Sequence, residues 1–238
     1  MIKPNLLPIV LFAVLLAGSP RLSAQQRQQT AQPAEALPMV SAVVATPPDL
    51  PMIGKWMIDR SGTTAHWLGE VYESKRLYEP INVILVDAAA ASANDAKERL
   101  VAAVKTAGYP VRVGHSTGYR GLIGGSLYDQ LPQGRDDAFS NRIFVETNNH
   151  GRLFGPHRFG DAFVFIGAFS RERVNMLEWP AHRYGSFTEA RDDFARQLDA
   201  KTGFKLLGRV SLDNAIADDP DITTGDHDGQ AVLLRAGQ

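Results

Sequence analysis

The sequence predicts an α+β domain, preceded by an export signal, in which two main helices pack on a mixed β-sheet. Three observations carry this prediction. Two segments have the apolar periodicity and the capping residues of amphipathic helices. Several short apolar runs, among them Pro80–Asp87 and Ala162–Ser170, have the composition of buried strands. The first 24 residues have the layout of a secretory signal peptide.

Residues 1–24 are predicted to be this signal peptide. Lys3 supplies the positive start, and Ala24 offers a small residue at the cleavage site. The apolar run Leu6–Gly18 is shorter than the roughly 20 residues that a membrane-spanning helix needs. We therefore expect an exported protein, periplasmic or secreted, whose mature form has no transmembrane segment. An uncleaved membrane anchor is the alternative.

Residues 25–51 are rich in Gln, Ala and Pro, a composition that cannot bury a core and that favours a flexible linker. The folded domain is expected to span residues 52–238. Nothing after the leader is apolar enough to cross a bilayer.

The composition excludes several classes of function. Lys and Arg total 25 against 26 Asp and Glu, which leaves a net charge of -1, so a basic nucleic-acid-binding surface is not expected. The chain has 0 Cys, which excludes a disulfide scaffold, cysteine-ligated zinc, an iron–sulfur cluster and a thiol nucleophile.

In the first half of the domain, the sequence predicts a strand, a helix and a second strand in succession. Pro80–Asp87 is a nearly continuous apolar run, typical of a strand that is buried on both faces. Ser92 as N-cap and Asp95 three residues later begin a helix that ends at Gly108. Tyr109–Val113 follows as a strand, so this stretch is interpreted as a βαβ unit.

A glycine-rich segment, Gly114–Gly125, follows this unit. It contains neither the Gly-x-x-x-x-Gly-Lys-Ser/Thr pattern nor a Gly-x-Gly-x-x-Gly pattern that leads into a helix. We interpret the segment as a mobile connection that can flank a site, and we do not expect a nucleotide-binding loop.

The second half of the domain is predicted to be rich in strands. Arg142–Glu146 and His150–Phe154 flank a hairpin turn at residues 147–149. Ala162–Ser170 has apolar residues at both its odd and its even positions, so both faces of the strand are apolar, which indicates a central strand. Residues 173–178 are expected to pair beside it.

The second helix is predicted from Ser186, which forms a capping box with Glu189, and it ends at Gly203. Two late strands are predicted to close the chain. They are Lys205–Leu212 and Ala231–Arg235, the second of them preceded by a hairpin turn at Asp228-Gly229.

Several short segments of the domain have spacings that resemble one known family. They are Pro80–Val83, Ala107–Tyr109, His150–Phe154, Phe165–Ser170, Glu189–Asp192 and Asp228-Gly229. Together they are similar to the C-terminal domain of LssY-type membrane proteins, over most of residues 52–236. The resemblance implies no activity, because none is established for that family's C-terminal domain. In relatives this domain is often joined to a membrane-embedded phosphatase-like region; because these 238 residues contain no such region, envelope lipid chemistry is not carried over.

The candidate ligand-binding residues are histidines and arginines of the second half. His150 and Arg152 alternate on one predicted strand, so their side chains are expected to share a face. An imidazole beside the planar donor fork of a guanidinium suits an anionic group. Residues 142–196 contain eight Arg and no Lys, which favours oriented recognition over diffuse attraction. The candidates are His150, Arg152, His157, Arg158, Arg171 and Arg173.

Arginine–carboxylate pairs that only stabilise the fold are the competing interpretation. The same span contains seven acidic residues, and Arg191 and Asp192 on the second helix are expected to form such pairs.

No metal and no cofactor are expected. The sequence has no His-Glu-x-x-His helix, and the separation of its histidines matches no recognised ligand spacing. Only convergence in space can build a metal site. The residues for it are His150, His157 and His182, with Asp161 or Asp192.

The leading hypothesis is an exported domain that recognises an anionic small molecule or a component of the cell envelope through His150, Arg152 and Arg171. The first alternative is a phosphoesterase-like hydrolase in which His150 is the acid/base and Arg152 holds phosphate. The second is a scaffolding module whose exposed sheet edge binds a partner strand. The sequence leaves open whether the protein is an enzyme.

Overall fold

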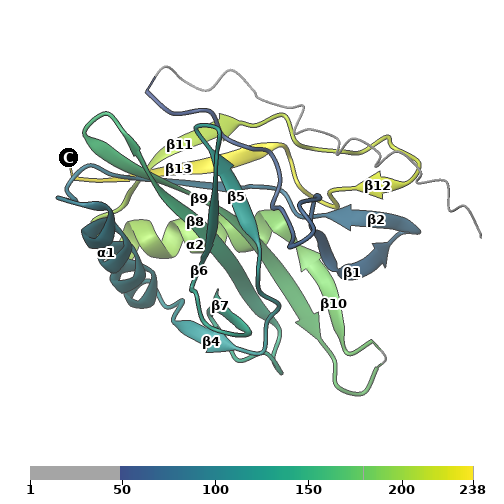
Figure 1. The fold of residues 1–238 in the computed structure, drawn as a ribbon. Coiled ribbons are helices and arrows are strands. Elements are labelled where there is room, and N and C mark those ends of the chain that lie inside the picture. The colour runs from purple at the N-terminus through teal and green to yellow at the C-terminus, as the bar shows by residue number, and fades with distance from the viewer. Residues whose placement is uncertain (1–48, 179, 238) are drawn as a thin grey trace, which may run out of the picture. The chain divides into compact units, whose positions relative to one another are not determined.

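The structure, a computed structural model, describes residues 49–178 and 180–237. Strands dominate this part of the chain, and the two helices α1 and α2 accompany a mixed sheet, as predicted (Figure 1). The predicted signal peptide and residues 25–48 of the predicted linker lie outside the described residues. Within those residues, no helix has the length and hydrophobicity to span a membrane.

The main sheet has ten strands, and seven of them follow one another in the order β11-β13-β3-β9-β8-β6-β5. β10 pairs with β9, while β7 joins β8 to β4. β3 runs parallel to β13 and antiparallel to β9, which makes the sheet mixed. The strands are β3 (Val83–Asp87), β4 (Val111–Val113), β5 (Arg120–Ile123), β6 (Ser126–Leu131), β7 (Asp137–Ser140), β8 (Asn148–Phe159), β9 (Ala162–Val174), β10 (His182–Ser186), β11 (Lys205–Ser211) and β13 (Gln230–Ala236).

A second sheet has three strands in the order β1-β2-β12 (Figure 1). β1 (His66–Tyr72) and β2 (Lys75–Tyr78) are antiparallel, and β12 (Ile222–Thr223) adds to β2 in the parallel direction. β1 also lies beside β10 of the main sheet, since the Glu70 carboxylate accepts a hydrogen bond from the Tyr184 N–H at 3.0 Å.

The two helices begin at the predicted caps. The Ser92 hydroxyl accepts the Asp95 N–H at 3.2 Å and begins α1 (Ala93–Thr106). The Ser186 hydroxyl accepts the Glu189 N–H at 2.9 Å and begins α2 (Phe187–Lys201). Each cap satisfies a backbone donor that has no partner inside the helix.

The main sheet is covered on both faces, because alternate side chains of its central strands enter two separate cores. One core lies under the helices and contains Leu85, Leu100 and Phe194. The other lies on the opposite face and contains Ile84 together with Ile53 from the segment before β1. β3 is therefore buried throughout, as its apolar run predicts.

The predicted hairpin at residues 147–149 is wrong. Residues 142–146 form no strand, and β8 begins at Asn148, where it pairs with Glu172 of β9. The two asparagines are strand residues because their polar groups are bonded inside the fold: Asn148 Nδ2 donates to Glu172 Oε2, and the Asn149 N–H donates to Asn141 Oδ1. Nor do residues 173–178 form a separate strand, since β9 runs to Val174 and β10 pairs back on it.

Two further local predictions need correction. β4 runs parallel to β3, but β9, β8 and β7 lie between them, so the two strands are not neighbours as in a simple βαβ unit. Asp228-Gly229 is not a short hairpin turn, because the connection from β11 to β13 spans residues 212–229. Asp228 instead binds arginines of α2 and β11.

Candidate functional site

A cleft of about 300 Å³ opens on the sheet face opposite the helices. His150 and Arg152 of β8 line it, on the same side of the strand as Phe154, which packs in the core away from the helices. The predicted shared face of His150 and Arg152 is thus confirmed. The ionisable residues that line the cleft are Glu79, His115, His150, Arg152, Glu172 and His182.

His150 is held in one tautomer by Asn148. The amide nitrogen of Asn148 donates to the Glu146 carbonyl at 2.8 Å and to Glu172 Oε2 at 3.1 Å, so its Oδ1 must be the acceptor. His150 Nδ1–H therefore donates to this oxygen, at 3.0 Å. The proton is fixed on Nδ1, and the lone pair of Nε2 accepts no hydrogen bond from the residues that the structure describes.

Glu172 is oriented through both carboxylate oxygens. Its Oε1 accepts from His182 Nδ1 at 2.8 Å, and its Oε2 accepts from Asn148 at 3.1 Å. The Glu172 side chain is only 4% exposed, whereas that of His182 is 30% exposed. β8, β9 and β10 therefore hold one carboxylate in a defined position beside His150.

His115 reaches the cleft from the loop that follows β4. Gly114 has a φ of 100°, and a Cβ at this position would lie 2.7 Å from the Phe144 ring, so the turn requires glycine. Arg152 holds the other side of the loop, since its Nε and Nη2 donate to the Ser116 carbonyl oxygen at 3.2 and 2.7 Å. The glycine-rich segment thus flanks the site, as its composition suggests.

Three buried groups converge at the cleft, namely His115, His150 and Glu172. One ligand atom of each lies within 4.8 Å of the other two. The two imidazole rings are 4.6 Å apart between centroids. His115 Nε2 is buried and has no hydrogen-bond partner among the described residues.

Burial lowers the pKa of His115 to about 4, and the nearby charge of Arg152 acts in the same direction. The pKa of His150 is also well below its usual value, because of burial and of the neighbouring His115 and Arg152. Both imidazoles are therefore uncharged at neutral pH, in contrast to the positive charge that an anion-binding histidine can add.

Arg152 is the permanent positive charge of the cleft. The residue is 3% exposed, and its guanidinium lies over the Tyr119 ring, 4.9 Å from the centroid. It forms no ion pair with the described residues, and its Nη1 makes no hydrogen bond to them. Charge and donors thus remain available to a ligand.

Glu79 adds a second carboxyl group to the cleft. The residue is 4% exposed, and its carboxyl group makes no hydrogen bond within the described chain. Burial raises the pKa of Glu79 to about 7, although the charge of Arg152 opposes this rise. Near neutral pH this group can both accept and release a proton.

The later residues of β8 do not join the cleft. A β-bulge between Phe154 and His157 shifts the register of the strand, and His157 Nδ1 bonds to the Tyr128 hydroxyl at 2.8 Å. Arg158 is exposed, and its Nε donates to a nearby backbone carbonyl in the turn between β8 and β9.

Arg171 and Arg173, which are also among the predicted ligand-binding residues, lie outside the cleft. They alternate with Glu172 on β9, so they lie on the helix side of the sheet. Arg171 lines a separate groove beside α2, where its Nε is 3.4 Å from Glu189 Oε2. Arg173 is exposed. Arg171 thus forms an ion pair with Glu189, of the kind that the competing interpretation expects.

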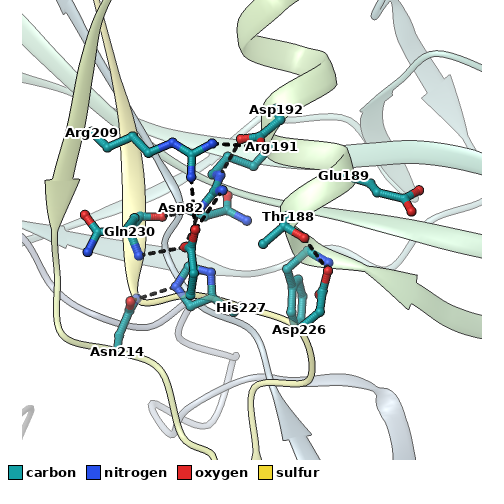
Figure 2. Close-up of polar contacts among 12 residues, drawn as sticks. Asn82, Thr188, Glu189, Arg191, Asp192, Arg209, Asn214, Asp226, His227 and Gln230 are labelled. Carbon is teal, nitrogen blue, oxygen red and sulfur yellow. Dashed lines mark hydrogen bonds and ion pairs between the residues drawn. The ribbon is translucent and has the colours of Figure 1, made fainter.

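Another polar cluster is fully occupied by its own ion pairs (Figure 2). Arg191 of α2 binds Asp192 and Asp228, and Arg209 of β11 binds the same two carboxylates. The predicted structural pairing of Arg191 and Asp192 is confirmed. With its charges matched internally, this network offers no group to a ligand.

Of the residues considered for a metal site, His150 and His182 line the cleft, whereas His157, Asp161 and Asp192 do not. Sequence reasoning missed His115, Glu172 and Glu79 as site residues. The only signal for His115 was its place in the glycine-rich connection. No pattern connects the three residues, because they come from segments far apart in the chain.

No protein-family model, curated protein or solved structure matches the chain. The likeness to LssY-type C-terminal domains therefore stays a prediction, and the function is argued from the cleft itself.

Proposed function

We propose that the domain, which the sequence predicts to be exported, binds a small anionic group in the cleft, and that Arg152 is the main recognition residue. The observation that carries the proposal is the buried Arg152 guanidinium, which forms no ion pair with a carboxylate of the described residues, although the Glu79 carboxyl group lines the same cleft. A buried charge is costly unless it is paired, and an anionic ligand provides the pair. A cleft at His150 also favours a ligand over the scaffolding alternative.

The rim of the cleft narrows the class of ligand. Leu68 and Phe144 line it and are 53% and 40% exposed, so the mouth presents apolar surface beside the buried charge. An anion that carries an organic group buries this surface on binding, whereas inorganic phosphate does not. We therefore expect an organic phosphate, phosphonate or carboxylate.

The test is calorimetric titration of the full chain with phenylphosphonate and with inorganic phosphate. We expect saturable binding, tighter for phenylphosphonate, and at least about tenfold weaker binding by Arg152→Gln, because the charge-assisted hydrogen bonds are lost. Arg152→Lys keeps the charge and is expected to recover part of the affinity.

Arg171→Gln is the matched control, because Arg171 lies across the sheet beside α2. Its affinity for phenylphosphonate should equal that of the unmodified chain. No saturable binding by the unmodified chain, or equal affinities for Arg152→Gln and Arg171→Gln, would overturn the proposal. Circular dichroism checks that each variant is folded, since Arg152 also holds the Ser116 loop.

A phosphoesterase-like hydrolase is the second candidate, and Glu79 is the observation that favours it. Its carboxyl group shares the cleft with Arg152 and has a pKa of about 7. The pairing of an anion-binding guanidinium with a carboxyl group that titrates near neutral pH is typical of acid–base catalysis. The pKa of His150, by contrast, is lowered by burial and by the neighbouring His115 and Arg152, which favours its neutral form over the acid role that the sequence suggests.

For this candidate, we expect hydrolysis of p-nitrophenyl phosphate that Glu79→Gln slows by about 10²-fold, at the lower end of what general acid–base catalysis contributes. The measurement is the release of p-nitrophenolate by the full chain at pH 7, with Arg171→Gln as the control of unchanged rate. Binding of phenylphosphonate without any turnover would leave recognition as the function and reject the hydrolase.

A further inference from the structure

We propose that His115, His150 and Glu172 bind a divalent transition-metal ion in the cleft. The proposal goes beyond anion recognition and does not depend on it. Its basis is geometric: three buried side chains from a loop, from β8 and from β9 place one ligand atom each within 4.8 Å of the others.

The donor set decides the class of metal. Two imidazole nitrogens and one carboxylate oxygen suit zinc or iron(II), whereas magnesium and calcium prefer oxygen ligands throughout. Three protein ligands with a further position open to a cleft are typical of catalytic rather than structural metal sites. Here that position opens into the space that Arg152 and Glu79 also line.

The surrounding hydrogen bonds are those that orient metal ligands in proteins. A metal-binding histidine usually donates its other ring N–H to an oxygen acceptor. His150 does so from Nδ1 to Asn148 Oδ1, at 3.0 Å, which leaves Nε2 as the donor to a metal. The same asparagine and His182 hold the two oxygens of Glu172.

His115 supplies an independent indication. Its Nε2 is buried without a hydrogen-bond partner in the described part of the chain, and the residue is only 7% exposed. A buried polar atom without a partner is costly and rare in native proteins. A metal ion held jointly with His150 and Glu172 gives this nitrogen its partner.

A metal ion at this place would act as a Lewis acid toward a bound anion or toward water. The residues of the chain have distinct tasks around it. Asn148 and His182 position the ligands, and Arg152 fixes the loop that carries His115 through the Ser116 carbonyl.

The test is a zinc titration of the full chain, prepared without a histidine tag and freed of metal with a chelator. Competition against a chromophoric zinc chelator measures the affinity. We expect one zinc ion per chain with a Kd in the micromolar range or tighter, and at least about 100-fold weaker binding by His115→Ala. Asn148→Ala is expected to weaken binding by about 10- to 100-fold as a positioning residue.

His157→Ala is the matched control, because His157 lies beyond the bulge of β8 and bonds to Tyr128. It should bind zinc as the unmodified chain does. The proposal is overturned if the unmodified chain binds no zinc, if His115→Ala binds as tightly as the unmodified chain, or if His157→Ala loses as much affinity. His115 lies in a loop, and thermal unfolding confirms that its variant is folded; added zinc should raise the Tm of the unmodified chain but not that of His115→Ala.

Failure of this proposal is distinguishable from failure of anion recognition. The titration uses the metal alone, and the phenylphosphonate titration is repeated with chelator present. Zinc binding without phenylphosphonate binding would support the metal site and reject the anion site, and the reverse result would do the opposite. Iron(II) and manganese(II) titrated under anaerobic conditions then rank the metals.

Discussion

Replacement of Arg191 by methionine should lower the free energy of unfolding by about 3 kcal/mol. The Arg191 side chain is 1% exposed (Figure 2). Its Nη1 donates to Asp228 Oδ1 at 2.5 Å and to the Gln230 carbonyl at 2.8 Å. Its Nε donates to Asp192 Oδ1 at 2.8 Å. Methionine keeps the apolar stem but leaves the Gln230 carbonyl without the Arg191 donor, and the carboxylates of Asp192 and Asp228 keep only the exposed Arg209 as an ion-pair partner. We expect the lower end of the range for a broken buried pair, because the carboxylates are partly exposed. Urea denaturation at pH 7 measures the change.

Arg209→Met is the matched control, since Arg209 binds the same two carboxylates at 2.9 and 3.0 Å. The side chain of Arg209 is 47% exposed, so solvent screens its ion pairs and replaces them when they are lost. Its replacement should cost less than about 1 kcal/mol. Equal losses in the two variants would show that burial of Arg191 does not set the strength of this network.

The helix starts could be predicted because capping is local. Ser92 and Ser186 each bond to an N–H three residues ahead, so both partners are visible in one short stretch of sequence. The shared face of His150 and Arg152 is equally local, because it depends only on the alternation of a strand. The prediction that Arg171 binds the ligand together with His150 was wrong, and the same alternation explains why. Arg171 is the neighbour of the cleft residue Glu172 on β9, so its side chain lies on the opposite face of the sheet.

The convergence of His115, His150 and Glu172 could not be predicted in this way. It depends on the antiparallel pairing of β8 and β9, which sets Asn148 opposite Glu172, and on a loop that follows β4. The bulge before His157 is another tertiary feature. At an odd separation from His150, His157 would lie on the opposite face of a regular strand; beyond the bulge it bonds to Tyr128, outside the cleft. Which strand lies beside which decides such a site, and composition or spacing does not reveal it.

Acid should destabilise the protein through His227, by about 2.5 kcal/mol between pH 7.5 and pH 4.5. Asn214 Nδ2 donates to the carbonyls of Lys55 and Ile81, so its Oδ1 accepts His227 Nε2–H at 2.7 Å. His227 Nδ1 is buried without a partner in the described chain, and a proton placed there would find no acceptor among those residues. Burial lowers the pKa of His227 to about 4, although the charge of Asp228 opposes the shift.

The sign follows from the two pKa values of His227. An unfolded histidine titrates near 6.5, so below that pH the unfolded chain takes up a proton that the folded chain refuses until about pH 4. The contribution of the neutral His227 to the free energy of unfolding is therefore fully present above pH 6.5 and is lost as the pH falls toward 4. In His227→Gln the amide N–H can still donate to Asn214 but does not titrate, so the loss between the two pH values should be smaller by about 2.5 kcal/mol. Urea denaturation of both proteins with chelator present measures the difference, because all other titrating groups are common to them. Equal acid losses would mean that His227 accepts its proton in the folded state as readily as in the unfolded chain.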